Sequence, residues 1–101
     1  MKTAMISQPM ANKSLKEIKE TRKLAKNDLE NYGYTVTDSL LFTPIETVKH
    51  KSLWCLAESL SVMSKCDTVY FCKGWKQARG CKIEHEAAKA YGLEIIYEED
   101  K

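Results

Sequence analysis

Short segments of strand type alternate with longer segments of helical periodicity along the whole chain, and this alternation constrains the fold more than any other feature. The strand-type segments are apolar and partly β-branched: 3–7, 34–38, 67–72 and 93–97. The segments with apolar residues at three- and four-residue spacing are 12–33, 51–66 and 81–92. Such alternation is typical of a parallel sheet with helices on both faces, joined by right-handed crossovers. We therefore expect an α/β fold, a small flavodoxin-like (Rossmann-like) three-layer sandwich with a parallel sheet of about four strands.

Single residues mark where several of these segments end. Pro9 has no N–H to donate to a sheet, so the first strand should stop before it. Asn12 or Ser14 can cap the first helix, and Gly33 and Gly92 are typical C-terminal stops. The first helix has a clear stripe of recurring positions: Leu15, Ile18, Arg22, Ala25, Leu29 and Tyr32.

Length and charge limit the classes of protein that this chain can belong to. Its 101 residues favour one domain spanning 1–101, and 44% hydrophobic with 30% charged residues is typical of a soluble globular protein. A formal net charge of +2, with lysines interleaved with acidic residues in the first helix, argues against a nucleic-acid polymer as partner. No apolar run approaches the roughly 20 residues that cross a bilayer, and the start lacks a signal-peptide core. We expect no membrane association and a cytoplasmic protein, in the bacterial host cytosol if a phage encodes it.

The four cysteines do not indicate a metal site. Cys55, Cys66, Cys72 and Cys81 have no C-x-x-C spacing, and no His or Cys ligands cluster near them in the sequence. We expect reduced thiols, no bound metal and no cofactor.

The carboxyl ends of the strands are where an open α/β sheet binds its ligands. The candidate binding residues in the loops at these ends are Ser7, Gln8, Met10, Asp38, Gly74, Trp75, Arg79 and Gly80. Trp75 can stack on a nucleobase, but it can equally plug the end of the core or pack against another subunit. Arg79 stands beside a glycine at an expected helix start, a place suited to a phosphate.

The run Glu84-His85-Glu86 can be divided by helical geometry. If Ile83 marks a buried stripe with Ala87, Ala90 and Tyr91, Glu84 borders that stripe, His85 points into solvent and Glu86 lies on the other flank. We expect Glu84 in the first turn, where the helix N-terminus favours its ionised form and burial opposes it. An ionised carboxylate there suits a nucleophile, although it can also simply stabilise the helix.

Three stretches together resemble the nucleoside 2-deoxyribosyltransferase-like superfamily: "ISQPM", "CDTVYF" and "GWKQARGCKIEHEAAKAYG". The nearest branch is a compact one, common in bacteria and phages, whose domain is often left without an assigned function. The resemblance implies cleavage of a base–sugar N-glycosidic bond, with Glu84 as the nucleophile and Asp67 as the assisting carboxylate. It also implies that Gly80 lets the loop approach the sugar or phosphate, and that a covalent intermediate splits the reaction into two steps.

The chain departs from the superfamily pattern at Ala78, where such enzymes often have Ser or Asp. The reaction class therefore carries over better than the substrate, which we expect to be a nucleoside monophosphate or a cyclic nucleotide signal. Destroying such a signal would serve a phage as anti-defence. The alternatives are a non-catalytic nucleotide-binding module or sponge, a nucleoside deoxyribosyltransferase, and a purely structural protein. The apolar helix 51–66 and the resemblance predict a homodimer or a higher homo-oligomer.

Overall fold

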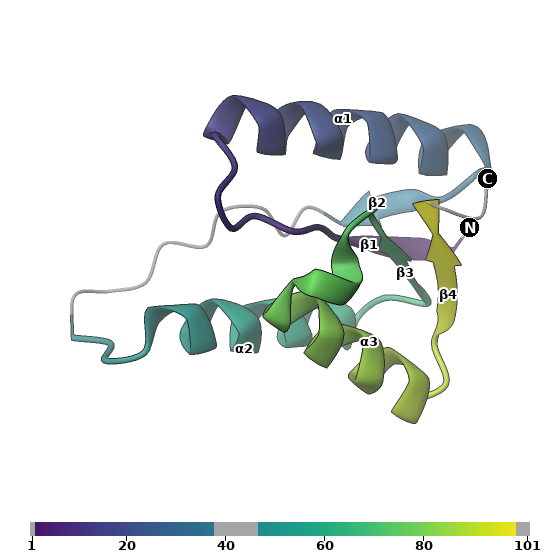
Figure 1. The fold of residues 1–101 in the computed structure, drawn as a ribbon. Coiled ribbons are helices and arrows are strands. Elements are labelled where there is room, and N and C mark those ends of the chain that lie inside the picture. The colour runs from purple at the N-terminus through teal and green to yellow at the C-terminus, as the bar shows by residue number, and fades with distance from the viewer. Residues whose placement is uncertain (1, 38–46, 99–101) are drawn as a thin grey trace.

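The computed structural model of the protein describes residues 2–37 and 47–98, and its ribbon is shown in Figure 1. The strands are β1 (Thr3–Ser7), β2 (Thr35–Thr37), β3 (Thr68–Phe71) and β4 (Glu94–Tyr97). The helices are α1 (Leu15–Asn31), α2 (Lys51–Met63), the short 3₁₀ helix η1 (Trp75–Gln77) and α3 (Arg79–Ala90). The expected alternation of strands and helices is confirmed. Asp38 lies outside the described residues.

The sheet is parallel and has the strand order β2-β1-β3-β4. Ala4 lies between Val36 and Thr68, and Ser7, the last residue of β1, lies opposite Phe71. This arrangement confirms the small flavodoxin-like sandwich. Because the order of the strands reverses between β1 and β3, the switch point lies where these two strands end.

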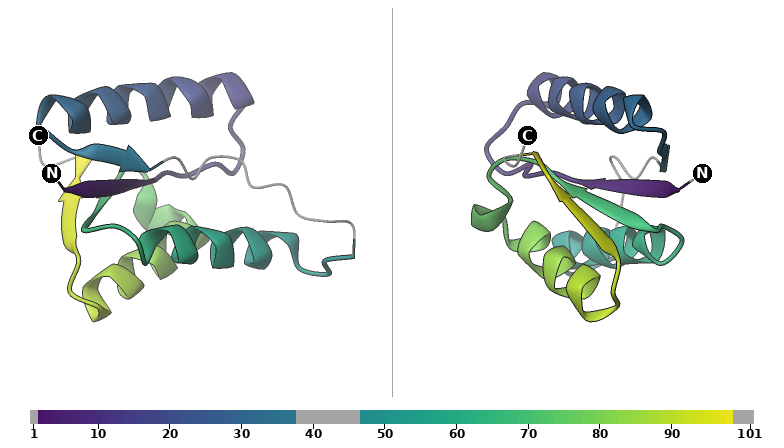
Figure 2. Two further views of the ribbon diagram at one scale, coloured as in Figure 1. Left: turned by 180° about the vertical axis from the view of Figure 1, so that it is seen from behind. Right: turned by 90° about the vertical axis from the view of Figure 1, so that its right-hand side faces the viewer.

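The helices form a layer on each side of the sheet. Helix α1 covers one face, and α2 and α3 cover the other (Figures 1 and 2). Successive strand residues point to opposite faces, so Met5 and Phe71 join the core under α2 and α3, while Ile6 and Tyr70 join the core under α1. The two apolar cores therefore hold the carboxyl ends of β1 and β3 from both sides.

Helix α1 follows the sequence prediction closely. The Ser14 side chain caps it by accepting a hydrogen bond from the backbone N–H of Glu17 at 3.1 Å. Gly33, just after its end, has φ +90°, a conformation that favours glycine. The middle of the predicted stripe is buried, whereas Leu15 and Tyr32 at its two ends are exposed.

Helix α2 ends at Met63, earlier than expected, and is weakly buried for an apolar helix. Met63 is its one buried residue in this chain, and Leu53 is 61% exposed. A second copy packed against this helix would cover such apolar surface. The homo-oligomer stays a prediction.

Helix α3 corrects both the boundary and the buried stripe expected from the sequence. It begins at Arg79, so Glu84 is its sixth residue. Glu84 therefore lies beyond the first turn, and the helix dipole acts most strongly on charges within that first turn. Its buried residues are Cys81, Glu84 and Ala88, whereas Ile83 is exposed. Ala90 and Tyr91, also expected in the stripe, are exposed too. The buried face of α3 carries two small side chains and a carboxylate hydrogen-bonded by Ser7, so the most hydrophobic residues of this segment do not mark it.

Candidate functional site

The centre of the candidate site is a buried carboxylate at the switch point. Glu84 is 7% exposed and Ser7 is 2% exposed, and the Ser7 hydroxyl donates a hydrogen bond of 2.5 Å to Oε1 of Glu84. The fold thereby brings together two residues that the sequence proposed separately and that lie 77 positions apart.

The environment of Glu84 pulls its ionisation in two directions. Burial raises the pKa of this carboxyl above its ordinary value, while the Ser7 and Ser59 hydroxyls counteract part of that rise. Hydroxyl donors favour the charged form because they solvate it where water is excluded. Cys81 lies beside Ser7 and Glu84, but burial raises the pKa of its thiol to about 11, so the thiol stays neutral at physiological pH. The site can therefore offer one carboxylate, whose charge depends on the serine hydroxyls.

Ser59 is the member of this site that the sequence did not reveal. It lies on α2, in the helix expected only to pack and to pair with a second copy. The sequence does contain a sign of this role. Leu56, Ser59 and Met63 are spaced by three and four residues, so a serine interrupts the apolar stripe of the helix that faces the core.

Trp75 packs into the core, which is one of the three alternatives that the sequence left open. It is 8% exposed, and its ring stacks on His85 with centroids 4.1 Å apart and on Tyr97 at 5.6 Å. The structure contradicts the prediction that Trp75 stacks on a nucleobase, because the ring belongs to the core under α3 and Tyr97 packs against that core.

His85 is also corrected by this cluster. The sequence placed it in solvent, but the rotation of α3 turns it towards β4, where its Nε2 lies 2.6 Å from the hydroxyl oxygen of Tyr97. Burial lowers the pKa of the imidazole, so it is neutral more often than a free histidine. His85 therefore belongs to the packing of Trp75 and not to the chemistry of Glu84.

Gln8, predicted to bind substrate, has its amide occupied by α1. Its Nε2 donates to the carbonyl of Ile18 at 3.0 Å, and its Oε1 accepts from Arg22 at 3.3 Å. Met10 is 39% exposed beyond it. Gly74 has φ +85° and lies beside Pro9, so it shapes the turn that leads into η1. These residues position the loops, and Gln8 is corrected from a ligand contact to a structural one.

Asp67 lies at the wrong end of the sheet to assist Glu84. It precedes β3, its carboxylate accepts a hydrogen bond of 3.0 Å from the N–H of Thr3, and its own N–H donates to the carbonyl of Thr3. Ser7 lies four residues further along β1, which corresponds to about 13 Å. The prediction of an assisting role is therefore corrected: an aspartate before a parallel strand stands at the amino edge, whereas ligands bind at the carboxyl edge.

Replacing Asp67 by alanine should lower stability without changing the chemistry at Glu84. The N–H of Thr3 loses its acceptor, which costs about 1 kcal/mol. We expect the free energy of unfolding in urea to fall by that amount, and the rate of any reaction that depends on Glu84 to stay within twofold of wild type. A loss of activity comparable with that of a Glu84 variant would restore Asp67 to the active site.

Arg79 and Gly80 form the first turn of α3 and face the start of α2 across an open groove. We call it the α2–α3 groove, and its lining residues are His50, Lys51, Ser52, Leu53, Leu56, Arg79, Gly80 and Ile83. Its volume is about 550 Å³, within the range of small-molecule sites. Ala78 is the N-cap residue of α3 and provides no side-chain cap, so the departure noted in the sequence leaves this helix start without a hydroxyl.

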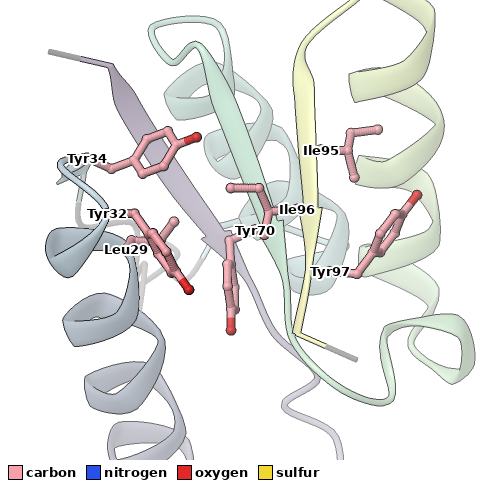
Figure 3. A pocket seen from close by; sticks show the side chains of 7 residues that line it. All are labelled: Leu29, Tyr32, Tyr34, Tyr70, Ile95, Ile96 and Tyr97. Carbon is pink, nitrogen blue, oxygen red and sulfur yellow. The ribbon is translucent and has the colours of Figure 1, made fainter. Parts of the chain in front are cut away.

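A second concavity lies between α1 and the outer strand β4, and Glu84 is not among its lining residues. Figure 3 shows it between α1 and β4, with Tyr32, Tyr34 and Tyr70 among its lining residues, and its volume is about 490 Å³. The Tyr34 hydroxyl donates to Glu94, and burial raises the pKa of Tyr70 to about 12. The lining residues that the structure describes are aromatic or aliphatic, and none of them is a carboxylate placed like Glu84.

Two further expectations concern what the described part of the chain lacks. Residues 2–37 and 47–98 contain no group of three His, Cys, Asp or Glu side chains that could hold a metal ion. Over the same residues, every helix is too short or too polar to cross a membrane. The four cysteines are free thiols.

Comparison with known proteins gives one match. The model of a family described as "Domain of unknown function (DUF4406)" matches residues 3–97, which include every element of the sheet and all three α-helices. No curated protein and no solved structure shows a significant match to the chain.

Proposed function

We propose that this chain, which belongs to the family described as "Domain of unknown function (DUF4406)", is an N-glycosidase that cleaves the base–sugar bond of a nucleotide. The reaction class comes from the sequence resemblance to nucleoside 2-deoxyribosyltransferase-like enzymes. The observation that carries the proposal is the Glu84 carboxylate, buried at the switch point and hydrogen-bonded by Ser7 at 2.5 Å.

The proposed reaction has two displacement steps at the anomeric carbon. An oxygen of the Glu84 carboxylate attacks that carbon, and the C–N bond breaks with its electron pair going to the base nitrogen, which takes a proton from water. Water then attacks the same carbon, breaks the glycosyl ester, loses a proton to solvent and restores the carboxylate. A covalent intermediate of this kind divides one difficult step into two easier ones.

The serine hydroxyls have a defined task in this scheme. Water exclusion makes a carboxylate a less solvated nucleophile but also favours its protonated, unreactive form. Ser7 and Ser59 offset that effect by donating to the carboxylate. Ser7 is therefore proposed as a positioning residue that keeps Glu84 ionised and fixes the direction of its reacting oxygen.

The test is release of free base from a panel of substrates by the purified full chain. The panel contains purine and pyrimidine nucleoside monophosphates in ribose and deoxyribose forms, cyclic dinucleotides and the free nucleosides, and chromatography separates base from sugar phosphate. Base release that depends on Glu84 supports the proposal. Tight nucleotide binding without base release from any member of the panel would instead support a non-catalytic binding module, which the deep burial of Glu84 favours as the second candidate.

The pH dependence of base release should report the hydrogen bond between Ser7 and Glu84. Because the nucleophile must be ionised, activity should fall as the pH falls through the raised pKa of Glu84, so the acidic limb lies above 4.5, the ordinary value. Replacing Ser7 by alanine removes a donor that lowers this pKa, so the limb should move to higher pH. The measurement is kcat/KM against pH for both proteins. An unmoved limb would show that Ser7 does not control the ionisation of Glu84.

A further inference from the structure

The α2–α3 groove combines a cationic rim with an apolar wall. Lys51 and Arg79 contribute the cationic side chains, Leu56 and Ile83 contribute apolar surface, and none of the lining residues that the structure describes is acidic. Among the described residues, neither Lys51 nor Arg79 forms an ion pair. Two cations that line one cavity favour an anionic ligand.

The groove lies next to Glu84 along both helices. Gly80 lines it and precedes Glu84 by one turn of α3, a rise of about 6 Å. Leu56 lines it and precedes Ser59 by almost one turn of α2. A phosphate bound beside Gly80 would therefore lie about one helical turn from Glu84 along α3.

The backbone of the groove leaves space for a ligand. A Cβ atom added to Gly80 would have no heavy atom within 4 Å, so the first turn of α3 is open on this side. The guanidinium of Arg79 can donate two parallel hydrogen bonds to phosphate oxygens, and Lys51 can supply a point charge from the facing helix.

We propose that the α2–α3 groove binds the phosphate of the substrate through Lys51 and Arg79, and that the protein therefore acts on phosphorylated nucleosides in preference to free nucleosides. This inference deepens the proposed function and rests on it for the position of the sugar. In this proposal, Lys51 and Arg79 take the place of the hydroxyl that nucleoside 2-deoxyribosyltransferase-like enzymes often carry at the position of Ala78. Lys51 lies on α2, a helix that the sequence did not connect with the site.

Phosphate binding can be measured without any reaction. The full chain, labelled with ¹⁵N, is titrated with inorganic phosphate, with a nucleoside monophosphate and with the corresponding nucleoside. We expect saturable shifts of the Arg79 and Gly80 amides with both phosphates, tighter binding of the monophosphate, and an at least tenfold higher Kd for each phosphate in Lys51→Gln/Arg79→Gln. The matched control is Lys65→Gln/Lys82→Gln, which removes the same charge from exposed sites outside the groove and should leave the Kd unchanged.

The outcomes separate this inference from the proposed function. Phosphate binding at the groove without base release from any substrate would uphold the phosphate site and overturn the glycosidase. Base release with equal kcat/KM for nucleosides and their monophosphates would uphold the glycosidase and overturn the phosphate site. No saturable binding, or binding weakened equally by both double variants, would also overturn it, because a general charge effect does not need the groove.

Discussion

Replacing Glu84 by glutamine should reduce the rate of base release by at least about 10³-fold, the scale of loss typical when a nucleophile or essential acid–base group is removed. Glutamine keeps the size of the side chain and can still accept a hydrogen bond from Ser7, so the fold has no reason to change. It cannot form the glycosyl ester. The measurement is single-turnover base release from the best substrate of the panel.

The matched control lies two residues away on the same helix. Glu86→Gln removes the same charge from an exposed position and should retain full activity. Wild-type rates in Glu84→Gln, or an equal loss in both variants, would contradict the role of Glu84.

Thermal melting separates a chemical loss from unfolding in this experiment. Burial raises the folded-state pKa of Glu84, so its contribution to stability is fully present below 4.5 and is lost as the pH rises through the raised value. Glu84→Gln has no carboxylate to ionise, so it should be at least as stable as wild type at pH 7 and should lose that advantage below 4.5. A variant that is less active and more stable at pH 7 identifies a carboxylate retained for function.

Replacing Trp75 by alanine should destabilise the protein by about 3–5 kcal/mol, the usual cost of removing a large buried aromatic side chain. The ring fills the space between Phe71, His85 and Tyr97, and its loss leaves both stacked partners without a contact face. Urea denaturation followed by circular dichroism measures the change. In a domain of this size, each kcal/mol corresponds to about 4–8 °C in Tm.

The conservative variant Trp75→Phe distinguishes a packing role from a ligand-binding one. It should recover much of the lost stability, because it restores an aromatic ring in the same cluster, and it should leave KM unchanged. If Trp75→Ala folded with wild-type stability and only raised KM, the original idea of a base-stacking tryptophan would return and the core assignment would be wrong.

The fold was predictable because each element has its own local signal. The strand β1 was placed at its exact bounds from an apolar run and Pro9, and α1 from a capping serine and a stripe of apolar residues. Alternation of such elements leaves few topologies. The strand order and the placing of helices on both faces of the sheet follow from this small set of topologies, and no single residue specifies them.

The candidate site was predictable in its residue types and less so in its geometry. Ser7 is predictable as the end of a parallel strand, and Glu84 from its place on the helix and from the resemblance; the structure joins them. The assisting role of Asp67 came from the resemblance alone, and the structure places this carboxylate at the amino end of β3, away from Glu84. The prediction that His85 points into solvent failed because the buried stripe of α3 runs through Glu84 and not through Ile83. A shift of one position turns the helix by about 100°, which brings His85 to the packed face.

The sequence by itself determined the elements and their parallel arrangement, because backbone preferences and hydrophobic periodicity act over a few residues. Only the tertiary structure decided which face of α3 is buried, which places Glu84 under the Ser7 hydroxyl and Trp75 in the core. It also brought Lys51 to the same groove as Arg79. These contacts join segments that lie far apart in the sequence, and they depend on the rotation of α3 against the sheet and α2, which no local pattern encodes.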